Sequence, residues 1–201
     1  MIAVRAAVIT VSTKGAAGQR TDESGPAMRE ALLAAGHEVL SAVLVPDDIA
    51  KVANAILDAT RAGANVVLTS GGTGLSPNDV TPEATRRVID REVPGIAEAL
   101  RARSLAKTAH GMLSRAVAGA IGATLVVNLP GSPRAVRESL EVLLPVLPHA
   151  VELLAGETGD PALERVPFAR RAARSRDDDV VWRDEQEHGR RAGRRSARSC
   201  R

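Results

Sequence analysis

A glycine-rich loop near the middle of the chain carries residue types that bind small anions. It reads Thr69-Ser70-Gly71-Gly72-Thr73-Gly74 and follows a short β-prone apolar run at residues 66–68. Glycines leave backbone N–H groups open to an anion, and the hydroxyl groups add donors. A helix is expected downstream, with Thr81 as N-cap and Pro82 as its first residue. The pattern predicts a phosphate site, although an ordinary strand-to-helix turn has a similar composition.

Two aspartates are expected close to this loop. Asp47 follows an apolar run at residues 39–45, and Asp79 comes shortly after the glycines. Phosphoryl and nucleotidyl transfer use Mg²⁺, which prefers one or two carboxylates together with phosphate oxygens and water. Asp47 and Asp79 are therefore candidate catalytic residues and magnesium ligands. A helix cap at Asp47 or an Asx turn at Asp79 would need the same residue types, but Asp48 is the better capping residue.

Polar residues at other strand ends extend the candidate binding site. Ser12 follows the first apolar run, and Pro130-Gly131-Ser132 follows the last one. Ser132 is expected to cap a helix that begins at Pro133. The free N–H groups of that helix would face the same ligand, unless the segment is only a turn.

A short polar island supplies two further candidates, Ser114 and Arg115. Arg115 can bind a substrate phosphate through two hydrogen bonds, although a surface serine and a surface arginine are the plainer interpretation. His110 and His149 have no partner at metal-ligand spacing, so we expect both to be structural. The sequence has no Gly-x-Ser-x-Gly elbow, and the chemistry is expected to come from positioning and charge neutralisation.

These residues need a scaffold that brings distant loops together. The expected strands are residues 6–11, 39–45, 66–68 and 124–129, and the expected helices are 26–35, 49–62, 81–91, 96–107 and 133–155, the last interrupted by prolines. The alternation predicts an α/β fold, a three-layer sandwich in which a mostly parallel sheet has helices on both faces. Such sheets bind ligands at the carboxyl ends of their strands, where the four polar loops are expected.

The composition fits a protein with one ordinary domain and an extension. Of 201 residues, 44% are apolar and 1% are aromatic, so the core must consist of Val, Leu, Ile and Ala. The single cysteine, Cys200, excludes an internal disulfide and a cysteine metal cluster, and we assign it no role. The N-terminal residues lack a charged leader, and no apolar stretch reaches membrane-spanning length. We expect a soluble, cytoplasmic protein without a membrane partner.

The positive charge of the chain is concentrated at its C-terminal end. Residues 1–163 contain 15 Lys and Arg against 17 Asp and Glu, a net charge of −2, whereas residues 164–201 contain 12 against 7, a net charge of +5. We therefore predict a single domain at residues 1–157 and a disordered, Arg-rich tail at 158–201. A slightly acidic domain makes a nucleic-acid partner unfavourable, apart from weak contacts of the tail.

Several motifs resemble the molybdopterin adenylyltransferase (Mog/MoaB-type) family of molybdenum-cofactor biosynthesis. The resemblance covers residues 3–156, about four-fifths of the chain. The motifs that carry it are Thr69-Ser70-Gly71-Gly72-Thr73-Gly74, Asp79-Val80-Thr81-Pro82-Glu83-Ala84, Pro94-Gly95, Met112-Leu113-Ser114-Arg115 and Asn128-Leu129-Pro130-Gly131-Ser132-Pro133.

The resemblance implies a specific reaction and specific residues. The family has an α/β sandwich fold, commonly forms a homotrimer and uses Mg-ATP to adenylylate molybdopterin with release of pyrophosphate. A separate molybdenum-insertion enzyme then takes the product. By position, Asp47 and Asp79 match the family's aspartates for Mg²⁺ and adenylyl transfer, and Ser114 matches the serine of its Leu-Ser-Arg motif. The implied substrate-binding and nucleotide-binding residues are Ser12, Ser70, Gly71, Gly72, Thr73, Gly74, Arg115, Pro130, Gly131 and Ser132.

The sequence departs from the family pattern at one position. Members often have Ser-Asp after the first strand, whereas Thr13 follows Ser12 here, and Asp22 retains an acidic group in this region. The Arg-rich tail is not part of the pattern either. A paralogue that binds or carries molybdopterin without turning it over is therefore the alternative function, although the presence of Asp47, Asp79 and Ser114 argues for an enzyme.

Overall fold

The computed structural model describes residues 2–156, which belong to one compact unit, Met1–Arg165. The expected tail, its boundary after residue 157 and Cys200 lie outside the described residues, so they stay predictions. Within residues 2–156, no helix is both long and apolar enough to cross a membrane.

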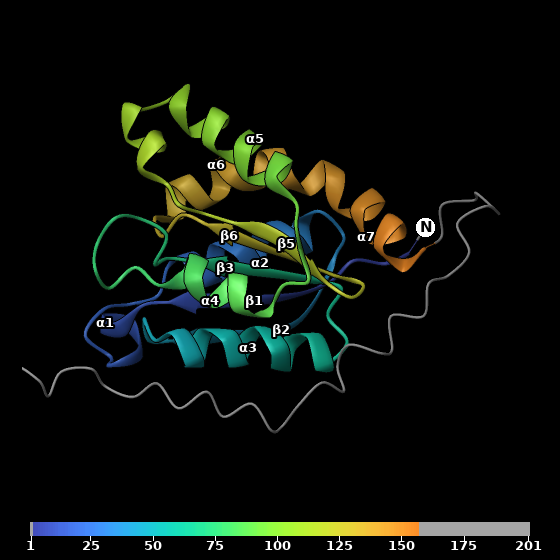
Figure 1. Ribbon diagram of the computed structural model, residues 1–201, viewed down its shortest axis with the longest axis horizontal. Helices are drawn as coiled ribbons and strands as arrows, with labels where there is room; N and C mark the ends of the chain where they lie inside the picture. Colours follow the sequence, from blue (N-terminus) through green and yellow to red (C-terminus); the bar gives the residue numbers. More distant parts are fainter. Residues whose placement is uncertain (1, 157–201) are drawn as a thin grey trace, which may run out of the picture. The chain divides into compact units, whose positions relative to one another are not determined.

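A six-stranded sheet with the order β2-β1-β3-β6-β5-β4 forms the middle layer (Figure 1). The first four of these run parallel, while β5 pairs antiparallel with β6, and β4 pairs antiparallel with β5. The strands are β1 (Arg5–Val11), β2 (Glu38–Val45), β3 (Val66–Ser70), β4 (Arg91–Glu92), β5 (Ala118–Ile121) and β6 (Thr124–Leu129). The continuous apolar runs of β1, β3 and β6 follow from burial on both faces of the sheet.

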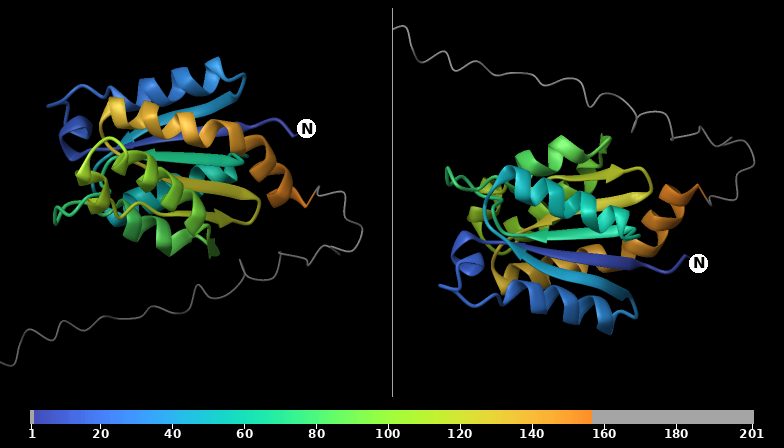
Figure 2. Two further views of the ribbon diagram at one scale, coloured as in Figure 1. Left: turned by 90° about the horizontal axis from the view of Figure 1, so that it is seen from above. Right: turned by 90° about the horizontal axis from the view of Figure 1, so that it is seen from below.

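Helices cover both faces of the sheet (Figure 2). One face packs against α2 (Ser24–Ala34), α5 (Pro94–Leu105), α6 (Pro133–Leu143) and α7 (Leu147–Ala155), and the other against α3 (Ile49–Arg61) and α4 (Thr81–Val88). Alternation along β3 divides the core accordingly, because Leu68 belongs to the first apolar cluster and Val67 to the second. The short elements are α1 (Thr13–Ala16), η1 (Ala109–Leu113) and η2 (Leu144–Val146). The predicted α/β sandwich with a mostly parallel sheet is confirmed.

One expected boundary and one expected cap are wrong, and one strand was not expected. The helix expected to reach residue 91 ends at Val88, and the chain then forms β4. The segment around Gly119, for which no strand was expected, forms β5, a strand without the β-branched pattern that usually marks one. Thr81 is the first residue of α4 rather than its N-cap, and its hydroxyl donates to the Gly71 carbonyl at 2.8 Å.

Other local expectations agree with the structure. Asp48 caps α3 by accepting from the Lys51 N–H at 2.8 Å, which leaves Asp47 free for another role. Ser132 caps α6 by accepting from the Ala135 N–H at 3.2 Å. The last helical segment is divided into α6, η2 and α7, as its prolines predict.

Candidate functional site

An open cleft of about 370 Å³ lies at the carboxyl ends of the parallel strands. Eight of the residues expected in the site line it: Ser12, Asp47, Ser70, Gly71, Gly72, Asp79, Gly131 and Ser132. They come from four loops that are far apart in the sequence. The parallel strand order brings these loops together, because each loop follows a strand that ends at the same edge of the sheet.

The glycine loop packs tightly against the neighbouring strand ends. Gly71 and Gly72 have φ angles of +99° and +61°, in the left-handed region that favours glycine. A Cβ atom on Gly71 would lie 2.3 Å from the Val11 carbonyl oxygen. The Gly71 N–H donates to the Leu129 carbonyl at 3.3 Å. Part of the role of these glycines is therefore close backbone packing, and the Gly71 N–H is already engaged.

Thr13 holds the carboxylate of Asp47 in one orientation. Asp47 Oδ2 accepts from the Thr13 N–H at 2.7 Å and from the Thr13 hydroxyl at 2.8 Å, and the Asp47 N–H donates back to that hydroxyl at 3.0 Å. The other oxygen, Oδ1, lies beside Gly72, where a Cβ atom would be 3.1 Å away. The Thr13 hydroxyl therefore orients the Asp47 carboxylate.

Asp79 is held within its own loop. Its Oδ2 accepts from the Ser76 N–H at 2.9 Å, and the Asp79 N–H donates to the Ser76 carbonyl at 2.9 Å. The same oxygen lies 2.9 Å from the place a Cβ atom on Gly74 would take. A side chain at residue 74 would therefore push the Asp79 carboxylate away from the glycine loop.

Asp47 and Asp79 fit Mg²⁺ better than a metal that needs a closed set of protein ligands. Within residues 2–156, no group of three or more His, Cys, Asp or Glu side chains could hold a metal ion. Mg²⁺ is commonly bound by one or two carboxylates and completes its coordination with water and phosphate oxygens. Two aspartates on an open cleft match that donor set.

The cleft also contains charged residues that were not among the expected site residues. Arg20 is the one cation among the described lining residues, and Asp22 and Glu23 add two carboxylates to Asp47 and Asp79. Asp22 Oδ1 accepts from the Ser24 and Gly25 N–H groups, both at 3.0 Å, at the start of α2. The signal available in the sequence was the polar run at residues 20–25, which follows the first strand. The lining therefore has four carboxylates and one guanidinium.

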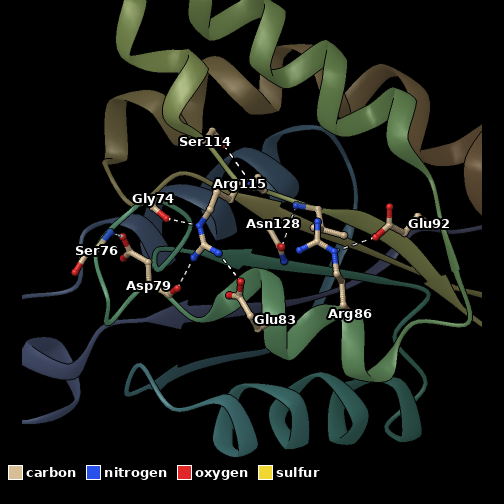
Figure 3. Close-up of polar contacts among 11 residues, drawn as sticks. Gly74, Ser76, Asp79, Glu83, Arg86, Glu92, Ser114, Arg115 and Asn128 are labelled. Carbon is tan, nitrogen blue, oxygen red and sulfur yellow. Dashed lines mark hydrogen bonds and ion pairs between the residues drawn. The ribbon is translucent and has the colours of Figure 1, made fainter.

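Five expected site residues do not line the cleft: Thr73, Gly74, Ser114, Arg115 and Pro130. Ser114 and Pro130 line a separate small cavity of about 50 Å³ beside α5 and α6. Arg115 points instead toward the loop after β3 and toward α4 (Figure 3). Its Nε donates to the Gly74 carbonyl at 2.6 Å. The guanidinium therefore bonds to the protein and does not line the cleft, and the expected binding of a substrate phosphate stays a prediction.

Arg115 also forms an ion pair with Glu83 in the first turn of α4. Burial acts to raise the pKa of Glu83, but hydrogen bonds from Arg115 and the backbone and the charges of Arg115 and Arg86 outweigh it. The pKa of Glu83 is consequently lowered. A carboxylate at the N-terminal end of a helix is also favoured by the helix dipole.

A buried asparagine connects the sheet to α4. Asn128 is 1% exposed, and its amide group donates to the hydroxyls of Thr69 at 2.9 Å and Thr85 at 2.8 Å. Its side-chain oxygen accepts from the Val117 N–H at 3.1 Å. Because a buried amide needs all these partners, Asn128 belongs to the framework that holds α4 against β3 and β6.

Sequence comparisons connect this architecture to molybdenum-cofactor biosynthesis. The family described as "Probable molybdopterin binding domain" matches residues 7–149. The molybdopterin adenylyltransferase of Pyrococcus furiosus is 40% identical over 154 residues, which cover 72% of this chain and 90% of that protein. The molybdenum cofactor biosynthesis bifunctional protein of Chlorobaculum tepidum is 39% identical over 153 residues. The match covers 76% of this chain, which spans about half, 49%, of that relative.

The fold leads to the same group of proteins. The molybdopterin biosynthesis enzyme MoaB from Thermus thermophilus has a TM-score of 0.72 and 51% sequence identity, over 76% of this chain and 97% of that chain. The matched region includes the glycine loop and both aspartates that face the cleft. The sequence match and the shared fold confirm the resemblance noted in the sequence, and the chain belongs to the Mog/MoaB family of molybdenum-cofactor biosynthesis.

Proposed function

We propose that the protein adenylylates molybdopterin with Mg-ATP and releases pyrophosphate. The observation that carries the proposal is the arrival of Asp47 and Asp79, from two separate loops, at one cleft beside the glycine loop. The relative from Pyrococcus furiosus, which is named a molybdopterin adenylyltransferase, supports the same reaction.

In the proposed reaction, an oxygen of the terminal phosphate of molybdopterin attacks the α-phosphorus of ATP. A new P–O bond forms to that phosphorus, and the bond from it to the bridging oxygen of pyrophosphate breaks. Asp47, through Oδ1, and Asp79 would hold Mg²⁺. When bound, the metal neutralises negative charge on the transferring phosphate groups. Nucleophilic catalysis by the protein is not needed, since positioning and charge stabilisation can carry such a transfer.

The charge balance of the cleft supports the proposal that a divalent cation takes part. Four carboxylates line it, and Arg20 alone among the described lining residues opposes them. The phosphates of ATP and molybdopterin would be repelled by such a surface without a divalent ion. The N-terminus of α6, at Ser132 and Pro133, contributes a weaker attraction for an anion.

We further propose a cytoplasmic homotrimer that passes adenylyl-molybdopterin to a separate molybdenum-insertion enzyme. The family supports this assignment. Residues 1–157 would form the catalytic domain, and residues 158–201 would be an Arg-rich tail. Light scattering on the purified protein measures the oligomeric state, and a monomer would contradict the trimer.

A molybdopterin-binding paralogue without turnover is the second candidate. The observation that favours it is Thr13, which stands where many family members have an aspartate. The orientation of Asp47 by Thr13 favours the enzyme instead, because a binder would not need Asp47 held in one direction.

Substitution of the two aspartates separates an enzyme from a binder. Asp79→Asn is expected to lower single-turnover adenylylation at least about 100-fold, equivalent to about 2.7 kcal/mol, because its charge acts mainly in the transition state. Asp47→Asn should have a similar but smaller effect. Molybdopterin affinity should be retained or slightly improved, since each variant removes a negative charge. Asp48→Asn is the matched control, because Asp48 caps α3 and the amide oxygen can still accept from Lys51.

Two outcomes would contradict the proposal. Activity of both Asp79→Asn and Asp47→Asn within about twofold of the parent would remove the metal assignment. Binding of molybdopterin by the parent without formation of adenylyl-molybdopterin would establish the binding paralogue.

A further inference from the structure

Arg115 connects two ends of the loop that carries Asp79 (Figure 3). Its Nε donates to the Gly74 carbonyl at 2.6 Å, and its Nη2 donates to the Asp79 carbonyl at 2.5 Å. The Arg115 backbone N–H donates to the Thr73 carbonyl at 2.9 Å. One arginine therefore bonds to the chain before and after the intervening segment, residues 75–78.

That segment has little else to hold it. Residues 75–78 are all exposed, and Leu75 has 64% of its surface accessible to solvent. Ser76 makes the hydrogen bond that the Asp79 carboxylate accepts. Because Ser76 lies on the exposed segment, it can orient Asp79 only while the segment keeps its shape. The bonds from Arg115 restrict that shape from outside the loop.

The guanidinium is itself fixed on the side away from the loop. Glu83 pairs with its Nη1, and the two side chains are 40% and 33% exposed. All three nitrogen atoms of the guanidinium thus have an acceptor in the protein. A planar fork of donors suits two carbonyls and one carboxylate, whereas the single ammonium of lysine cannot reach all three in the same geometry.

We propose that Arg115 is a positioning residue: it holds the ends of loop 74–79 together so that the Asp79 carboxylate stays beside the glycine loop. The inference rests on the proposed adenylylation, and it assigns Arg115 a role other than binding a substrate phosphate. A misplacement of about 1 Å at a reacting group can cost about 100-fold in rate. Arg115 therefore acts on turnover through Asp79.

The test compares Arg115→Lys with the parent, and uses Arg86→Lys as a matched control. Arg86 also lies near Glu83 but pairs with Glu92, at 3.0 Å, outside the loop. Arg115→Lys is expected to lower kcat about 10-fold to 100-fold. Its affinities for molybdopterin and for α,β-methylene-ATP should stay within about twofold of the parent. Arg86→Lys should change neither quantity by more than about twofold.

A double variant identifies the residue through which Arg115 acts. If Arg115 only positions Asp79, Arg115→Lys should cost little further activity in an Asp79→Asn background. If Arg115 binds a phosphate directly, the two losses would multiply and the affinity for molybdopterin or the ATP analogue would fall. Multiplying losses, or a lower affinity for either ligand, would overturn the proposal.

Amide hydrogen exchange tests, without reference to activity, whether Arg115 braces loop 74–79 by holding its ends together. The N–H groups of Ser76 and Asp79 are bonded inside the loop, so their exchange should become at least about 10-fold faster in Arg115→Lys. Exchange in β3 and α6 should stay unchanged, which shows that the variant is folded. Unchanged exchange in loop 74–79 would refute the brace even if the enzyme were active. If the parent lacks turnover but Ser76 and Asp79 still exchange faster in Arg115→Lys than in the parent, the role of Arg115 in holding the loop is upheld and only the proposed reaction is rejected.

Discussion

Gly71→Ala should destabilise the protein more than the same substitution at another left-handed glycine. At Gly71, φ is +99° and an added Cβ would lie 2.3 Å from the Val11 carbonyl oxygen. At Gly122, in the turn between β5 and β6, φ is +54° and nothing lies within 4 Å of the added Cβ. Gly122→Ala therefore measures the conformational cost without the collision.

The expected magnitudes follow from these two geometries. A left-handed conformation costs an alanine about 1–2 kcal/mol, and this applies to both variants. Overpacking adds about 1–3 kcal/mol at Gly71, because the atom in the way belongs to the backbone of a central strand and has little freedom to move. We expect a loss of about 1–2 kcal/mol in the free energy of unfolding for Gly122→Ala and about 2–5 kcal/mol for Gly71→Ala.

Chemical denaturation followed by far-UV circular dichroism measures both losses. Gly71→Ala should also weaken binding of α,β-methylene-ATP, because Gly71 lines the cleft, whereas Gly122→Ala should leave it unchanged. Equal losses of stability in the two variants would refute the packing argument. Unaltered ligand binding in folded Gly71→Ala would mean that the loop is only a turn.

Two further predictions concern single side chains. Thr13→Val should lower the adenylylation rate about 10-fold, equivalent to about 1.4 kcal/mol, because it removes the hydroxyl that orients Asp47, and Thr13→Ser should retain most of the rate in the same assay. Burial lowers the pKa of His37, so the folded state favours the neutral imidazole. Stability is then full above the unfolded pKa of about 6.5 and falls as the pH drops below it. The free energy of unfolding should decrease less in His37→Gln than in the parent between about pH 7.5 and about pH 5.5, and an equal decrease would contradict this origin.

Much of the fold could be predicted because its elements have strong local signals. The runs at residues 66–68 and 124–129 are continuous and apolar, as expected for strands buried on both faces. Asp48 and Ser132 indicated helix starts that the structure contains. The short strand around Gly119 was missed, because its small residues have no β-strand pattern, and pairing with β6 is what makes it a strand.

The sequence by itself determined which loops meet, and the tertiary structure decided which side chains face the ligand. Parallel strands necessarily end at one edge, so Asp47 and Asp79 could be assigned to a common cleft from the order of the elements. The direction of the Arg115 side chain could not be assigned, because its partner Gly74 is 41 residues away in the sequence. Local sequence does not show whether the guanidinium bonds to a loop of the protein or faces the cleft. The role of Thr13 could not be predicted either, because its hydroxyl donates to Asp47, which is 34 residues away in the sequence. Residue types and local periodicity specify the backbone framework, whereas side-chain direction depends on contacts that exist only after the chain has folded.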